Sequence, residues 1–182
     1  PYEYEEIENV NILQRAEVLN RINNRSSRGE IIVTYPEALT EKVINKKTLI
    51  KNTYGIKVGD NLDTNFMSSI LEEYDFERSD FVYEAGQYAI RGGIVDIFSF
   101  ANELPYRIEL FGNDVDSIRI FDPETQLSER KLLSVNIIPN TDILQNQSGE
   151  QVSLLEFLPE NTIVWSEDWG FLKEKIEQQK ED

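Results

Sequence analysis

Between residues 86 and 121 the chain alternates apolar runs with turn-forming residues, a pattern that predicts three consecutive β-strands. The apolar runs are 94–98, 106–111 and 115–121. Gly92-Gly93, a proline-containing segment at 102–105 and the turn signal Gly112-Asn113-Asp114 precede the first, second and third run. Short turns between such runs are typical of an antiparallel sheet.

The same pattern predicts a register, because side chains alternate between the two faces of a strand. A three-residue turn at 112–114 places Ile108 opposite Ile118, whereas a two-residue turn places Ile108 opposite Ser117. The first pairing keeps the apolar face of the hairpin intact. We therefore predict the three-residue turn.

The other face of this hairpin holds Arg107, Glu109 and Phe111, with Arg107 beside Arg119 on the neighbouring strand. Glu109 lies within reach of both arginines, so we expect it to hold their guanidinium groups in place. One interpretation is an ordinary solvated face, which the pattern alone favours. Phe111 supports a binding surface instead, because a large aromatic side chain among charges is uncommon on a surface without a partner.

The segment before this region has the pattern of an α/β protein. Helical spacing predicts a helix over 11–23, and the continuous apolar run Ile31–Tyr35 predicts a buried strand. Pro36 suits the first turn of a helix that we expect to reach about Ile44.

The segment after it has a similar pattern. A polar linker at 142–150 precedes a predicted helical turn over 152–158 and a second predicted buried strand at 162–165. Trp169, Leu172 and Ile176 mark a closing helix.

Between these flanks the pattern is that of a small α+β domain with an antiparallel sheet. Asp60 is a candidate helix N-cap, and a stripe at four-residue spacing follows it, formed by Leu62, Phe66, Ile70 and Tyr74. Further strand-like runs occupy 48–53, 76–88 and 131–138. We therefore divide the chain into 1–45, 46–139 and 140–182.

Composition narrows the possible functions. The 182 residues, 40% of them hydrophobic, suffice for one sizeable domain or two small ones. The formal net charge of −16 disfavours binding of a phosphate backbone by the whole chain, although a local basic patch remains compatible with it.

No apolar run has transmembrane length and no signal peptide is visible, so we expect a cytoplasmic protein with no membrane partner. Because the sequence starts at Pro1 rather than at methionine, we expect it to be an excised fragment.

The sequence also lacks the groups that common catalytic sites use. It contains no cysteine and no histidine, and no G-x-x-x-x-G-K-[ST] phosphate loop. Ser166-Glu167-Asp168 follows a strand-like run, as the acidic box of a helicase would. Without a phosphate loop, we interpret it as the solvated start of a helix. We expect no catalytic residue, no metal and no cofactor in this chain.

Two segments give a specific resemblance, Arg91-Gly92-Gly93-Ile94-Val95-Asp96-Ile97-Phe98 and Pro105-Tyr106-Arg107-Ile108-Glu109-Leu110-Phe111-Gly112. They resemble the bacterial transcription-repair coupling factors and the related excision-repair protein UvrB. Matches at Ile31–Tyr35, 121–125 and 154–159 extend the resemblance over nearly the whole chain. The coupling factors fit better, because UvrB has a tyrosine-rich DNA-clamping hairpin before the Ile31 strand and keeps an Asp-Glu helicase box.

The resemblance implies that the flanks are parts of degenerate helicase-like α/β domains and that 46–139 is a UvrA-interaction domain like the second domain of UvrB. Such a module recruits UvrA to a stalled RNA polymerase. In full-length family members other domains contain the ATPase motor and contact RNA polymerase and double-stranded DNA, and a C-terminal domain can mask the UvrA-binding surface. We expect the fragment itself to be a monomer.

The resemblance also implies which residues bind UvrA. In the two families the binding positions correspond to Arg91, Arg107 and Phe111, while Glu109 and Arg78 match positions used in UvrB. The alternative is a UvrB-like helicase fragment or a direct DNA-binding module. The acidic charge and the missing nucleotide loop favour the interaction module.

Overall fold

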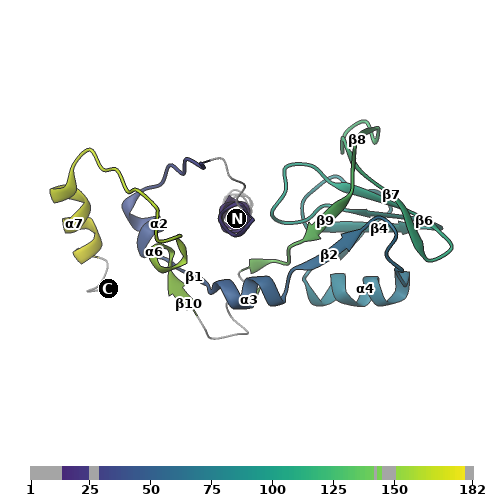
Figure 1. Cartoon of the computed structure of the whole chain (residues 1–182), viewed down its shortest axis with the longest axis horizontal. Helices are drawn as coiled ribbons and strands as arrows, with labels where there is room; N and C mark the ends of the chain where they lie inside the picture. The colour runs from purple at the N-terminus through teal and green to yellow at the C-terminus, as the bar shows by residue number, and fades with distance from the viewer. Residues whose placement is uncertain (1–13, 25–28, 142, 145–150, 179–182) are drawn as a thin grey trace, which may run out of the picture.

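The computed structural model describes residues 14–24, 29–141, 143–144 and 151–178, and it shows an α+β protein. A six-stranded sheet dominates one part of the molecule, and segments near both ends of the chain build a second core beside it (Figure 1). Among the described residues, no helix is both long enough and apolar enough to cross a membrane.

The six-stranded sheet has its strands in the order of the chain. The strands are β3 (Glu77–Arg78), β4 (Gln87–Arg91), β5 (Ile94–Ile97), β6 (Tyr106–Phe111), β7 (Asp114–Phe121) and β8 (Ser128–Leu132). All neighbours pair antiparallel except β3 and β4, which are parallel. The three strands predicted between 94 and 121 are therefore confirmed.

Two other predicted strands are each divided in the structure. Residues 76–88 form β3, a loop at 79–86 and the start of β4, because the loop turns back to bury Val82 against the sheet. Residues 131–138 form the end of β8 and then β9 (Ser134–Ile137). β9 leaves the large sheet and pairs antiparallel with β2 (Tyr54–Lys57) in a separate two-stranded sheet.

The β6–β7 hairpin has the predicted pairing of Ile108 with Ile118 but not the predicted turn. Phe111 pairs with Asp114, so the turn has two residues. Gly112 takes its first central position with a φ of +64°, which glycine adopts without steric cost. A β-bulge restores the register, because the ladder shifts by one residue between Glu109 and Leu110. The extra residue that the sequence argument assigned to the turn lies in the bulge.

One face of the large sheet packs against α4 (Thr64–Glu73), as Figure 1 shows. Asp63 caps this helix by accepting hydrogen bonds from the amides of Asn65 and Phe66, so the predicted cap at Asp60 is wrong. The residues of α4 buried in the core are Met67 and Leu71. The predicted stripe is therefore only partly on the core side: Leu62 is buried and Tyr74 packs against the core, whereas Phe66 is 58% exposed.

The second core joins both flanks of the chain. It contains the helical residues 14–23, β1 (Lys42–Ile44) paired with β10 (Gln151–Ser153), α3 (Lys46–Lys51) and α6 (Leu154–Phe157). The run 48–53, predicted as a strand, lies largely in α3. Asn45 caps this helix by accepting a hydrogen bond from Thr48, and Leu49 is its buried residue.

The remaining flank predictions are partly confirmed. The helix α2 (Pro36–Thr40) starts at Pro36 but ends before β1 rather than near Ile44, and α7 (Trp169–Gln178) is the expected closing helix. The expected helical turn at 152–158 is present as α6, preceded by β10. The start of the predicted helix over 11–23 and most of the linker at 142–150 lie outside the described residues.

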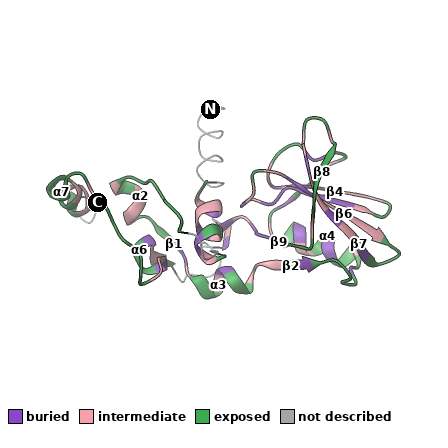
Figure 2. Cartoon of the chain, turned by 45° about the horizontal axis from the view of Figure 1, so that its top comes forward, coloured by how far each residue is buried: buried purple, intermediate pink, exposed green. Residues whose placement is uncertain are grey.

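The two predicted buried strands of the flanks are wrong. Ile31 and Val33 are each 92% exposed, and Ile163 and Trp165 are 81% and 90% exposed. A buried strand needs neighbouring strands to satisfy its backbone, and these runs have none among the described residues. Figure 2 accordingly shows α7 and the segment leading to it as largely exposed.

Candidate interaction surface

The face of the large sheet opposite α4 holds most of the charged side chains that the sequence singled out, and we call it the open face. Its residues, from β4 to β7, are Ala89, Arg91, Ile94, Asp96, Arg107, Glu109, Phe111, Ser117 and Arg119. The strand register sets Asp96 directly beside Arg107, and Arg107 beside Arg119. The alternation of side chains along β6 thus brings three of the predicted site residues to one face.

Asp96 is the centre of this face. Its carboxylate is completely buried, with 0% exposure, and it accepts three hydrogen bonds from two guanidinium groups. Arg107 donates from Nε to Oδ1 at 2.8 Å and from Nη2 to Oδ2 at 2.9 Å, and Arg91 donates from Nη2 to Oδ2 at 2.6 Å. Charge-assisted bonds of this kind offset the cost of burying a carboxylate.

Arg107 is therefore held from several directions and is only 14% exposed. Its guanidinium lies 4.4 Å from the ring centroid of Phe121, and Nη1 donates to the carbonyl oxygen of Gln126 at 2.9 Å. The hydrogen bonds to Asp96 raise the pKa of Arg107, and burial opposes this shift. The side chain contributes more to the internal order of the open face than to its exposed area.

Arg91 lies closer to solvent, with 34% of its side chain exposed. Its guanidinium lies 4.6 Å from the ring centroid of Phe81, and Nη1 donates to the carbonyl oxygen of Asp80. Arg91 thus connects the buried carboxylate to the loop at 79–86. Arg91 and Arg107 share the single negative charge of Asp96, so the three side chains together have a net positive charge of one.

Glu109 pairs with only one of the two arginines that the sequence argument assigned to it. Its Oε2 accepts a hydrogen bond from Ser117 and lies 3.3 Å from Nη2 of Arg119. The expectation that Glu109 holds Arg119 is confirmed. For Arg107 the expectation is wrong, because Asp96 stands directly opposite it on β5 and forms the hydrogen bonds instead.

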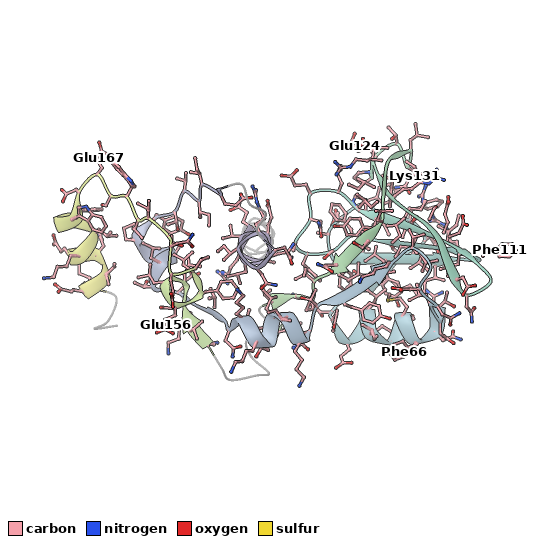
Figure 3. All side chains as sticks on the ribbon, viewed as in Figure 1. Phe66, Phe111, Glu124, Lys131, Glu156 and Glu167 are labelled. Carbon is pink, nitrogen blue, oxygen red and sulfur yellow. The ribbon has the colours of Figure 1, made fainter. Side chains whose placement is uncertain are left out.

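Phe111 ends β6 and is 83% exposed (Figure 3). This exposure excludes a position of Phe111 in the core beneath the Gly112 turn. A large aromatic side chain that contacts little of its own chain is available for contact with another molecule.

Arg78 does not join this group. It pairs with Tyr88 in the ladder, and Tyr88 belongs to the core beneath α4, so the register places Arg78 on the α4 side of the sheet. The charge of Arg78 also lowers the pKa of Tyr88, although burial raises that pKa by more.

The sequence argument missed Asp96 and Phe81. A signal for Asp96 was present, because it is the one charged residue within the apolar run 94–98. For Phe81 there was none, since the run 76–88 has the pattern of a strand. Among the described residues, no group of His, Cys, Asp and Glu could hold a metal ion.

The comparisons with known proteins agree with this architecture. Residues 55–143 match the UvrB interaction domain. The chain is 39% identical over 133 residues to the transcription-repair-coupling factor of Bacillus subtilis, which is 72% of this chain and 11% of that protein. It is 31% identical over 112 residues to the transcription-repair-coupling factor of Escherichia coli, covering 62% of this chain and 10% of that protein. The chain thus spans about a tenth of the length of the curated relatives it matches. The part of the chain that contains the six-stranded sheet therefore matches the UvrB interaction domain, and the chain is similar to part of the transcription-repair-coupling factors.

Proposed function

We propose that the open face binds UvrA and that the chain serves, as part of a transcription-repair coupling factor, to bring UvrA to RNA polymerase stalled at DNA damage. The family match at 55–143 supports this proposal, because UvrB itself is a partner of UvrA in the family that the sequence resembles. The binding residues would be Arg91, Arg107, Glu109 and Phe111. Arg78 would contribute little, because it lies on the other side of the sheet.

The observation that supports the proposal most strongly is Phe111, which stands 83% exposed at the end of a strand with two ordered ion pairs. Arginine and aromatic side chains dominate the binding energy of protein interfaces. The arginines here are already fixed by Asp96 and Glu109, so binding would cost little side-chain entropy. The positive charge left on the Asp96 cluster suits an acidic area on UvrA.

The proposal also assigns the remaining parts of the chain. Residues 46–139 form the UvrA-interaction unit, and residues 1–45 and 140–182 are parts of degenerate helicase-like segments. The fragment would neither bind nor hydrolyse ATP, since its sequence has no phosphate loop. Contacts with RNA polymerase and double-stranded DNA would belong to other parts of the full-length protein, in the cytoplasm.

Isothermal titration of the chain into purified UvrA tests this proposal. Phe111→Ala should weaken binding by about 2 kcal/mol, which is about thirtyfold. Phe66→Ala is a matched control, because Phe66 is also an exposed phenylalanine but projects from α4, on the other face of the sheet (Figure 3). A wild-type chain that does not bind UvrA, or that binds duplex DNA instead in a parallel filter assay, would refute the proposal.

A further inference from the structure

The loop at 79–86 crosses the open face and exposes two aromatic side chains. Val82 is completely buried in a small cluster with Ala89, Phe98 and Phe121. Its two neighbours are partly accessible, since Phe81 is 48% exposed and Tyr83 is 55% exposed. The buried Val82 thus anchors the loop and leaves both rings accessible.

Hydrogen bonds fix the backbone of this loop on both sides of Val82. Ser79 Oγ donates to the carbonyl oxygen of Phe81 at 2.7 Å, and Gln126 Nε2 donates to that of Val82 at 3.0 Å. The amide of Tyr83 donates to Oε1 of Gln87 at 2.9 Å. The two aromatic side chains therefore extend from an ordered backbone, which reduces the entropy lost when a partner contacts them.

The same loop contacts the more exposed of the two central arginines. Arg91 lies against the ring of Phe81 and donates to the carbonyl oxygen of Asp80. Asp96 can neutralise only one of its two guanidinium partners. Because Arg91 is 34% exposed and Arg107 only 14%, the remaining positive charge is accessible chiefly at Arg91, beside the Phe81 ring.

We propose that Phe81 and Tyr83 form, together with Arg91, a second contact site for UvrA, in which an acidic side chain of UvrA pairs with the exposed part of the Arg91 guanidinium beside the Phe81 ring. This inference rests on the proposed function and enlarges its surface from the end of β6 to the loop at 79–86. Charge complementarity selects the acidic group. The rings exclude water around the ion pair, as aromatic residues do at the centre of an interface.

Titration of single variants into UvrA tests this contact site. Phe81→Ala and Tyr83→Ala should each weaken binding about tenfold, with Phe66→Ala again as the unchanged control. Arg91→Gln should also reduce the dependence of affinity on salt concentration between 50 and 300 mM NaCl, roughly as expected for the loss of one ion pair. Thermal melts identify any variant that binds weakly because it has unfolded. If Phe81→Ala melts early, Tyr83→Ala alone decides the test, since its ring is the more exposed.

The outcomes separate this inference from the proposed function. If the wild-type chain binds UvrA and Phe111→Ala weakens binding while folded Tyr83→Ala binds normally, the second contact site is refuted and the proposed function stands. If the wild-type chain does not bind UvrA at all, the proposed function fails. An unchanged salt dependence in Arg91→Gln would refute the acidic partner group.

Discussion

Asp96 and Arg107 face each other across β5 and β6 and are joined by two hydrogen bonds, from Nε at 2.8 Å and from Nη2 at 2.9 Å. The carboxylate is completely buried, and the arginine is nearly so. A pair of this kind is costly to break, because removing Arg107 takes two of the three hydrogen bonds from a fully buried carboxylate. Arg107 therefore stabilises the domain in addition to any contact with UvrA.

The first prediction concerns this pair. Arg107→Ala should lower the free energy of unfolding by about 3 kcal/mol or more, as measured by urea denaturation. Arg91 would still donate to Asp96, so the chain should remain folded under mild conditions. Arg119→Ala is the control, because its ion pair with Glu109 is one-third exposed and should contribute at most about 1 kcal/mol. Equal denaturation midpoints for the two variants would show that the buried pair does not stabilise the fold.

This result also determines how binding data for Arg107 are interpreted. Weak UvrA binding by Arg107→Ala implies a direct contact only if the variant is folded in the titration. The sequence argument treated Arg107 as a surface residue, and the structure instead gives it 14% exposure. Phe111, with 83% exposure, is the better probe of the interface.

The sequence predicted the strands between 94 and 121 well because alternation and turn residues agree there. The pairing of Ile108 with Ile118 followed from the need to keep one face apolar. The turn itself could not be predicted in the same way, since a two-residue turn with a bulge and a three-residue turn give the same pairs beyond the bulge. Local pattern does not distinguish them.

Other features depend on long-range contacts that the sequence does not display. The run 76–88 resembles a strand, but its middle is a loop that buries the side chain of Val82 against Phe98 and Phe121. The runs Ile31–Tyr35 and 162–165 have the composition of buried strands without neighbouring strands in the described residues. The grouping of Arg91, Asp96 and Arg107 required the register of three strands at once.

A second prediction concerns the turn between β6 and β7. Gly112→Ala should destabilise the chain by about 1 kcal/mol, because an alanine at a φ of +64° is strained even though open space surrounds its Cβ. Gly112→Asn is the matched control, since asparagine tolerates this conformation better. Denaturant midpoints should follow the order glycine, asparagine, alanine. An alanine variant as stable as the wild type would contradict the assigned turn.

A third prediction compares parts of the chain by hydrogen exchange. The amides of β5, β6 and β7 should exchange much more slowly than those of Ile31–Tyr35, because the strands share ladder hydrogen bonds above a buried core. The backbone of 31–35 has no strand partner in the described residues, and Ile31 and Val33 are exposed. A truncated chain of residues 46–139 should keep the slow exchange if that unit folds independently. Equal protection of the two regions would contradict the prediction.

The last prediction concerns Tyr106 and alkaline pH. Tyr106 is 7% exposed, and burial raises its pKa from 10.0 to about 12, with a small opposing effect from the charge of Arg130. Between pH 10 and 12 the Tyr106 hydroxyl loses its proton in the unfolded chain but keeps it in the folded chain. The contribution of Tyr106 to the free energy of unfolding is therefore fully present below pH 10 and is lost as the pH rises toward 12. The loss should reach about 2 kcal/mol by about pH 11.5. Tyr54, Tyr74 and Tyr88 also have raised pKa values, so the comparison needs a variant that changes Tyr106 alone.

Tyr106→Phe removes the titrating hydroxyl and keeps the ring in the core. Urea denaturation of both proteins should give a constant difference in unfolding free energy from about pH 7 to about pH 9. Above pH 10 the wild type should lose stability faster than the variant, because only its unfolded state gains the additional tyrosinate. Parallel stability curves up to about pH 11.5 would show that Tyr106 ionises equally easily in both states. Its side chain would then be accessible to water at the start of β6 rather than part of the core beneath the open face.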